Sequence, residues 1–465
     1  MPGPSIGAVS TRGERPVEPA TNQLVVDFRG EGSGVEALTW GQRDVWDLMR
    51  RTGRTMNIGG TVRAADGETV ERTAELLRYM MGRHQALRTR LRAVEGGAPL
   101  QVVHGRGEIA LEIVDVPGGA GPDEVAEAVR VRYQTTMFDP FQEWPVRMAV
   151  IRSRAAVTHV VVMYYHVIVD GFGIDAVVRD LAHMGRPDSP VEGVQPLELA
   201  RQQREPAAVR QSEKSLRYWE RQLRRIPARP AGTPVAPADP SQPRHWEVVC
   251  VSPAMALAVR AIAARTGVAS GPILLAAYAV ALARLTDADA AAVQVVVSNR
   301  FRPGFAEAVG SLRQFGVCVI DVTDGTFDEV VARAWSAAIG AYKHGYYDTV
   351  AHQELVARIG RDLGDDLDLS CYLNDRRRET RDESAGPAPT PQEILAARPR
   401  STVRWGVREP TYDGAFYLHV EDVPDAIGYT LWGDTHRFAP EAIERCARDM
   451  ETLIVEAALD PVPAR

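Results

Sequence analysis

The 465-residue chain is poor in cysteine and has no long apolar run. Its 4 cysteines lie far apart and form no CxxC pair, which argues against a zinc or redox motif. Buried free thiols in a reducing compartment are the simpler interpretation. No stretch of about 18 apolar residues is present to span a bilayer, and residues 1–16 lack the apolar core of a signal peptide. We therefore expect a cytoplasmic protein that does not enter a membrane.

Other absences exclude several function classes. A net charge of -7 argues against a protein that binds nucleic acid through phosphate contacts. The sequence has no Walker-type phosphate loop, so ATP use is not expected, and no GxSxG turn, so Ser-His-Asp hydrolysis is not expected. The scattered histidines have no spacing such as HExxH. We expect neither a metal site nor a bound cofactor.

The length indicates two or three domains, or two large lobes. Residues 1–34 are expected to form a flexible N-terminal segment, in which only residues 24–26 read as a strand. An N-terminal lobe is predicted over 35–190 and a C-terminal lobe over 191–465, both of mixed α/β (α+β) character. Three segments rich in proline or polar residues are expected to be linkers or surface loops: 185–197, 226–244 and 376–404.

Hydrophobic periodicity predicts the main elements. Helices are expected from about residue 39 and over 70–83, 123–135, 174–181, 213–223, 253–265, 271–285, 327–343 and 439–458. Strands are expected within 87–103 and over 146–151, 157–165, 292–297, 316–322, 415–421 and 427–432. The segment 157–165 is apolar enough to be a buried internal strand.

The most informative segment begins where that strand ends. It reads Tyr164-Tyr165-His166-Val167-Ile168-Val169-Asp170-Gly171-Phe172 and leads into a helix. A rigid strand end can hold a catalytic side chain, and histidine moves protons near neutral pH. Asp170 can bond an arginine or the backbone, and Gly171 permits a positive φ or close approach of a substrate. A structural histidine followed by an Asp helix cap explains the spacing equally well.

This segment resembles the HHxxxDG signature of the condensation domains of nonribosomal peptide synthetases, within the chloramphenicol acetyltransferase-like superfamily. Four further segments resemble the family's other motifs in the right order: Leu38–Trp46, Arg83–Arg90, Ser298–Arg300 with Val309–Gly310, and Tyr429–Trp432 with the closing helix. The resemblance covers residues 35–462. It implies two acetyltransferase-like lobes in a V-shaped pseudo-dimer, with a tunnel between them that phosphopantetheine arms enter from opposite faces.

The resemblance implies roles for several residues. His166 is the second histidine of the signature, expected to orient the attacking amine or hydroxyl and take its proton, or to steady the tetrahedral intermediate. Asp170 is expected to be structural and paired with an arginine, with Arg88 as first candidate and Arg83 and Arg300 as the others. Gly171 completes the site.

The sequence departs from the family pattern at three places. Tyr165 stands at the first histidine of the signature, and we expect it simply to fill the strand end. Two later motifs survive only in degraded form, at 352–356 and 368–375, which predicts unusual recognition of the acceptor. The arginines at 376–378 are open to two interpretations, a contact for an acidic carrier protein or a solvated loop.

The resemblance implies a stand-alone enzyme that forms an amide or ester bond in the biosynthesis of peptide natural products. The acyl donor and the amine or hydroxyl acceptor would be delivered by peptidyl or aryl carrier proteins in trans, with phosphopantetheine as substrate handle. Two alternatives stay open: an acyltransferase that uses acyl-coenzyme A, and a catalytically weak recruitment platform.

Overall fold

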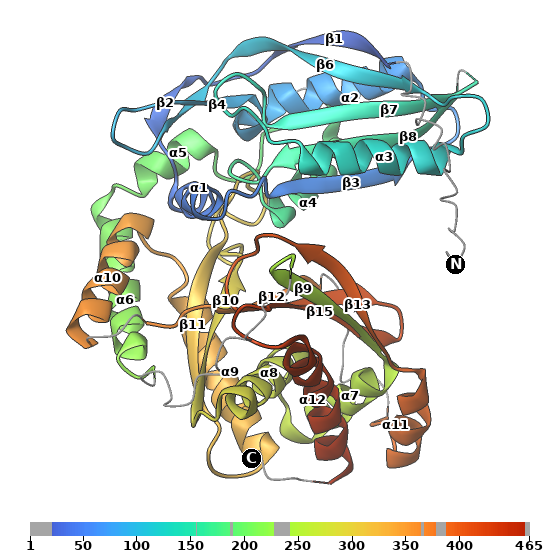
Figure 1. The fold of residues 1–465 in the computed structure, drawn as a ribbon. Coiled ribbons are helices and arrows are strands. Elements are labelled where there is room, and N and C mark those ends of the chain that lie inside the picture. The colour runs from blue at the N-terminus through green and yellow to red at the C-terminus, as the bar shows by residue number, and fades with distance from the viewer. Residues whose placement is uncertain are drawn as a thin grey trace, which may run out of the picture.

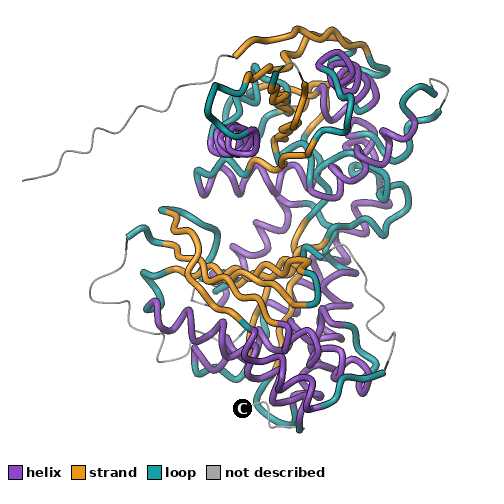
Figure 2. The backbone as a smooth tube through the Cα atoms, turned by 90° about the vertical axis from the view of Figure 1, so that its right-hand side faces the viewer, coloured by secondary structure: helices purple, strands orange, loops and turns teal. Residues whose placement is uncertain are grey.

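A computed structural model describes residues 21–154, 156–186, 189–226, 242–363, 367–377 and 387–460. The chain forms two α/β lobes, which Figure 1 shows one above the other. Seen from the side, the lobes meet along one edge and diverge toward the other (Figure 2). The V-shaped pair expected from the sequence is confirmed.

The N-terminal lobe is built on a five-stranded sheet whose order is β1-β6-β7-β8-β3. Only β6 and β7 pair in parallel. The strands are β1 (Thr21–Arg29), β3 (Asn57–Arg63), β6 (Arg106–Asp115), β7 (Val146–Ser153) and β8 (Ala156–Tyr165). Helix α2 (Val70–Arg83) packs on β1 and β6, and α3 (Pro122–Thr135) packs on β8 and β3. A small sheet of β2 (Gly34–Ala37), β5 (Leu100–Val103) and β4 (Thr89–Arg92) completes the lobe.

The C-terminal lobe is built on a seven-stranded sheet whose order is β11-β10-β12-β14-β15-β9-β13. The strands are β9 (His245–Ser252), β10 (Ala290–Val297), β11 (Gln314–Asp321), β12 (Cys371–Asp375), β13 (Thr402–Glu409), β14 (Phe416–Val423) and β15 (Ala426–Asp434). Four helices cover one face of this sheet: α7 (Pro253–Thr266), α8 (Ser270–Thr286), α9 (Phe327–Lys343) and α12 (Pro440–Leu459).

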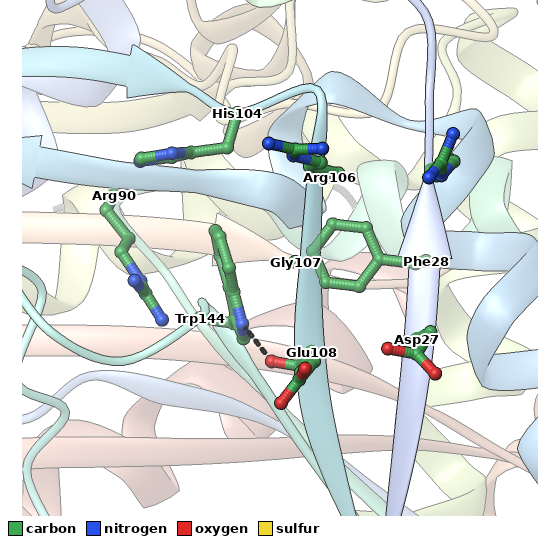
Figure 3. A pocket seen from close by; sticks show the side chains of 9 residues that line it. Asp27, Phe28, Arg90, His104, Arg106, Gly107, Glu108 and Trp144 are labelled. Atoms are coloured by element: carbon green, nitrogen blue, oxygen red, sulfur yellow. Dashed lines mark hydrogen bonds between the residues drawn. The ribbon is translucent and has the colours of Figure 1, made fainter.

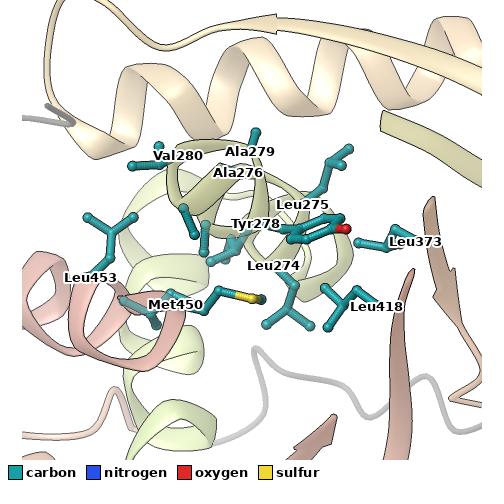
Figure 4. Close-up of a cluster of buried hydrophobic side chains, with 14 of the residues drawn as sticks. Leu274, Leu275, Ala276, Tyr278, Ala279, Val280, Leu373, Leu418, Met450 and Leu453 are labelled. Atoms are coloured by element: carbon teal, nitrogen blue, oxygen red, sulfur yellow. The ribbon is translucent and has the colours of Figure 1, made fainter. Parts of the chain in front are cut away.

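The core of this lobe surrounds α8, which is apolar on all sides. Figure 4 shows Leu274 and Tyr278 of this helix between Met450 of α12 and Leu418 of β14. Among the described residues, no single helix has the length and apolar character of a membrane span. Helices α7 and α8 meet both criteria only when they are taken together, and this pair is bent by 109°.

The opposite face of β11 carries α6 (Pro206–Leu223) and α10 (Thr349–Leu363). Alternation along the strand explains this double cover, because Phe315 and Val317 face α6 and α10 while Cys318 faces α9. Helix α1 (Trp40–Thr52) of the N-terminal lobe packs on α10 and β11. Both lobes therefore share a packed seam beside β11.

The segment 298–313, between β10 and β11, leaves the C-terminal lobe and packs into the N-terminal lobe. Val309 joins the core of the N-terminal lobe, and Leu312 packs with Trp40. A Cβ on Gly41 would lie 2.3 Å from the Ser311 carbonyl oxygen, and one on Gly173 would lie 2.9 Å from that of Gly310. Glycine at these two positions permits the close approach of the two lobes.

Helix α5 (Pro196–Gln202) packs on β2 of the N-terminal lobe, whereas α6 packs on β11 of the C-terminal lobe. We therefore propose that the boundary between the lobes lies between α5 and α6, rather than at residues 190 and 191. The helix predicted over 70–83 is confirmed with the same bounds, and helix α1 starts directly after the Thr39 cap.

Two predictions about loops need correction. Strand β1 occupies residues 21–29 because it pairs along its whole length with β6, so the flexible segment predicted over 1–34 is wrong there; residues 1–20 lie outside the described part. The loop expected over 376–404 contains helix α11 (Pro391–Ala397) and the start of β13. Residues 378–386 of that loop, and 227–241 of the predicted linker, lie outside the described residues.

Candidate active site

The His166 turn joins the end of β8 to the start of α4 (Gly171–Asp180). The carbonyl oxygen of Tyr165 accepts hydrogen bonds from the backbone of Ile168, at 2.9 Å, and of Val169, at 3.3 Å. Tyr165 itself is buried, and its ring packs against Phe138. It fills the end of the strand, and the tight turn after it holds His166 on a rigid support.

The two ring nitrogens of His166 are in different situations. Nδ1 lies 3.1 Å from the Val169 carbonyl oxygen, which can only accept a hydrogen bond, so Nδ1 carries the proton. Nε2 of the neutral ring is then left with a free lone pair. Burial, and to a smaller extent the nearby Arg313 guanidinium, lower the pKa of His166 to about 4, although Asp170 acts in the opposite direction. His166 is therefore neutral at pH 7 and able to accept a proton.

Asp170 joins the His166 turn to the C-terminal lobe. Its Oδ1 accepts from the Gly173 backbone at 2.7 Å, capping α4, and from Arg300 at 2.6 Å. Its Oδ2 accepts from the backbone of Leu312 at 2.8 Å and of Arg313 at 3.3 Å. Asp170 is only 2% exposed. The carboxylate thus serves as helix cap and ion-pair partner at once, and it fixes segment 298–313 against the turn.

The arginine that pairs with Asp170 is Arg300, so the first candidate, Arg88, is wrong. Arg88 is buried and donates to the carbonyl oxygens of Gly32 and His104, each at 2.6 Å, and to that of Glu31. It holds the β1–β2 connection instead. Arg83 pairs with Asp180 at the far end of α4, at 2.8 Å, so it does not reach Asp170 either.

A cavity of about 180 Å³ opens beside His166 at the interface of the lobes. The N-terminal lobe contributes His166, Gly171 and Phe172 to its wall, and the C-terminal lobe contributes Arg313 and Asn374. Both apolar and polar side chains line this space, which is typical of a small-molecule site. Neither lobe encloses the cavity alone.

Gly171 lies in the cavity wall with ordinary helical geometry, so of the two roles that the sequence allowed, a positive φ or close approach of a substrate, the positive φ does not occur. Helix α4 begins at this residue, and its first turn needs no left-handed conformation. A Cβ placed on Gly171 would meet only Ile58 Cδ1, at 3.8 Å. The space next to Gly171 is therefore open to a ligand, and a larger side chain would fill it.

Sequence reasoning missed two arginines of the cavity wall. Arg313 lies three residues after Val309–Gly310, the end of the motif that was recognised, and no local pattern marks it. Arg376 belongs to the basic run expected to be a carrier contact or a solvated loop. Its side chain instead bonds Glu421 at 2.8 Å and His419 at 3.2 Å and lines the cavity. Arg377 pairs with Asp375, and Arg378 lies outside the described residues.

A second, more open hollow of about 770 Å³ lies on the N-terminal lobe alone. Figure 3 shows Arg90 beside the Trp144 indole, whose Nε1 donates to the Glu108 carbonyl oxygen at 2.7 Å. Arg90 lies 3.7 Å from the ring centre. Phe28 and His104 also pack against the Trp144 ring, and no residue of the His166 turn lines this hollow. Within the described ranges, no group of His, Cys, Asp and Glu side chains could hold a metal ion.

Comparison with known proteins identifies the family. The family model described as the condensation domain matches residues 37–362. The chain belongs to the condensation domain family. Members of this family form peptide and ester bonds by acyl transfer.

Relatives of this condensation-domain chain include much longer synthetases. It is 25% identical over 326 residues to enniatin synthetase of Fusarium oxysporum, an alignment that covers 67% of this chain and 10% of the synthetase. It is 26% identical over 347 residues to isonitrile lipopeptide synthase of Mycobacterium tuberculosis, covering 69% of this chain and 13% of that protein. The chain thus spans only a small fraction of the length of these relatives.

Solved structures share the two-lobed fold. The condensation domain studied for chain release from the enacyloxin polyketide synthase has a TM-score of 0.69 and 17% identity, covering 94% of this chain and 85% of that one. The SgcC5 protein from Streptomyces globisporus has a TM-score of 0.68 and 21% identity, covering 91% and 99%. At these identities the likeness establishes the fold alone.

Proposed function

We propose that this condensation-domain protein transfers an acyl group from a carrier-bound thioester to an amine or hydroxyl acceptor, with His166 as general base. The observation that carries the proposal is the free Nε2 of a neutral histidine in the wall of the interlobe cavity. A neutral imidazole can take the proton of the nucleophile as its nitrogen or oxygen attacks the thioester carbon. Collapse of the tetrahedral intermediate forms the amide or ester and expels a thiolate, which takes the proton.

Asp170 and Gly171 have supporting roles in this proposal. The Asp170 carboxylate holds the turn and segment 298–313 together, so it positions His166 without touching substrate. Gly171 leaves the cavity open where a phosphopantetheine arm would pass. Tyr165 supports the strand end, and Arg300 neutralises Asp170.

The proposed partners are peptidyl or aryl carrier proteins acting in trans, and the proposed product is part of a peptide natural product. The isonitrile lipopeptide synthase relative supports this assignment, because its name refers to a lipopeptide product. The same cavity could accept a coenzyme A thioester, which carries an identical pantetheine arm.

The experiment is a calorimetric titration of the protein with holo and apo carrier proteins from its producing organism, run beside acyl-coenzyme A. We expect saturable binding of the acylated holo carrier that weakens when the arm is removed. If only the coenzyme A thioester binds, the protein is instead a small-molecule acyltransferase that uses acyl-coenzyme A. Equal binding of the holo and apo carrier proteins would indicate a docking platform.

Substitution of the proposed base completes the test. We expect His166→Ala to abolish turnover while the circular dichroism spectrum and thermal midpoint stay close to those of the wild type, because the side chain makes only one backbone hydrogen bond. Retained turnover in this variant would remove His166 from the mechanism.

A further inference from the structure

We infer that Arg313 is a specificity-determining residue and that the acceptor carries a free carboxylate, which Arg313 binds beside His166. This inference rests on the proposed function and deepens it by naming the substrate class. Arg313 and His166 line the same cavity from opposite lobes. A group bound by Arg313 therefore belongs to the part of the substrate nearest the attacking atom.

The position of Arg313 is fixed from both ends. Its backbone N–H donates to the Asp170 carboxylate at 3.3 Å, which ties its Cα to the His166 turn. Its guanidinium lies 4.8 Å from the ring centre of Phe315, and the residue is only 7% exposed. Such support holds the planar guanidinium in one orientation, as recognition of a carboxylate requires.

Asp44, the ion-pair partner of Arg313, uses only part of the hydrogen-bonding capacity of the guanidinium. Asp44 of α1 accepts from a single nitrogen, Nη1, at 2.9 Å. A guanidinium has five N–H donors in a fixed fork, which suits a two-point bond to a second carboxylate. Among the described residues, Asp44 is the one acidic side chain paired with Arg313.

The acidic side chains of the cavity wall are engaged by other groups, so the Arg313 guanidinium is placed to bind an anionic substrate group. Asp170 is paired with Arg300, and Asp375 is held by two hydrogen bonds from Arg377. Asp175 is engaged in a polar contact as well. Arg376 adds a second guanidinium on the same wall.

The class of acceptor follows from the chemistry of carrier attachment. An amino acid bound to a carrier has its α-carboxyl converted to an uncharged thioester. A carboxylate beside the nucleophile therefore belongs either to a free amino acid or to the acidic side chain of a bound one. The cavity of about 180 Å³ favours a small free acceptor over a long peptide.

A binding experiment tests this inference independently of the proposed acyl transfer. A panel of free amino acids and their carboxamides is titrated into wild type, Arg313→Gln, Arg313→Lys and a control, Arg90→Gln, which removes another aromatic-stacked arginine that does not line the His166 cavity. We expect wild type and control to bind the carboxylate of the best pair about tenfold or more tightly than its amide, as a charge-assisted hydrogen bond implies. Arg313→Gln should lose this preference, and Arg313→Lys should restore part of it.

Turnover then tests the step in which Arg313 acts. With a carrier-bound donor, Arg313→Gln should raise KM for the acid and leave the amide unchanged. Equal binding of acid and amide by the wild type, or no binding of either, overturns the inference. An equal fall in kcat for the acid and the amide acceptor also overturns the inference. It would indicate that Arg313 stabilises the oxyanion of the tetrahedral intermediate.

Two further measurements separate loss of the carboxylate site from loss of folding and from failure of the proposed function. If loss of the Asp44 pair unfolds Arg313→Gln, the double variant Arg313→Gln/Asp44→Asn removes both charges and should show the same loss of preference. If the wild type prefers the acid but transfers no acyl group from carrier or coenzyme A donors, the proposed function fails while the carboxylate site stands.

Discussion

Replacement of Asp170 by asparagine tests whether this carboxylate fastens the two lobes together. Both carboxylate oxygens accept hydrogen bonds, from Gly173 and Arg300 on one side and from the Leu312 and Arg313 backbone on the other. An amide must point its NH2 group at one of these sets of donors, whichever way it is turned. The substitution is therefore isosteric in shape but unfavourable in both orientations.

The magnitude follows from what is left unpaired. Removing one partner of a buried ion pair costs about 3–5 kcal/mol, and each buried N–H that loses its acceptor costs about 1–3 kcal/mol. Because asparagine keeps one acceptor oxygen, some of these hydrogen bonds survive, and we expect a total loss of about 3–5 kcal/mol of the free energy of unfolding. The measurement is urea denaturation at pH 7 followed by tryptophan fluorescence and circular dichroism, whose coincidence checks two-state behaviour.

A matched control is Glu444→Gln in the exposed pair with Arg448 of α12. Surface pairs at this spacing contribute about 0.3–0.5 kcal/mol, so the control should unfold almost as the wild type does. A double-mutant cycle with Arg300→Met should give a coupling energy of at least about 1 kcal/mol with Asp170→Asn. A loss below about 1 kcal/mol for Asp170→Asn, with no coupling, would refute the role assigned to the carboxylate.

Three other predictions concern the cavity. Since the pKa of His166 is lowered to about 4 and only the neutral ring accepts a proton, kcat/KM should be level from pH 6 to 8 and fall below about pH 4–5; a fall centred near pH 6.5 would contradict this. The stability contributed by the neutral ring should likewise be complete above pH 6.5 and decline as the pH falls toward 4. Gly171→Val should lower kcat/KM at least tenfold with little change in thermal midpoint, because its side chain enters open cavity space. The control is Gly60→Val in β3, where a Cβ would meet nothing within 4 Å and the residue does not line the His166 cavity. Equal activity of the two variants would show that substrates do not pass Gly171.

Local sequence patterns predicted the elements that carry their own signal. The apolar run before His166 identified β8, and Thr39 with the periodic residues after it identified α1. Strand β3 was missed because two glycines interrupt it and few of its residues are apolar. It forms because Gly59 allows close pairing with β8: a Cβ there would lie 2.2 Å from the Val162 carbonyl oxygen.

The same contrast holds within the site. His166, Asp170 and Gly171 are neighbours in sequence, so one motif with its strand and helix located all three. Arg300 could be named only as one of three candidates, because it lies 130 residues beyond Asp170. Its pairing depends on the return of segment 298–313 to the N-terminal lobe, which no local pattern records.

The sequence by itself determined the two-lobed α/β architecture, the strand–turn–helix around His166 and the resemblance to condensation domains, because each follows from short-range spacing of apolar, glycine and capping residues. The tertiary structure alone decided which arginine neutralises Asp170, that Arg313 stands in the cavity wall, and which ring nitrogen of His166 keeps its lone pair. These depend on distances between groups far apart in the chain, or on the direction of a single hydrogen bond. Packing of the two lobes sets the first two, and the geometry of the turn between β8 and α4 sets the third.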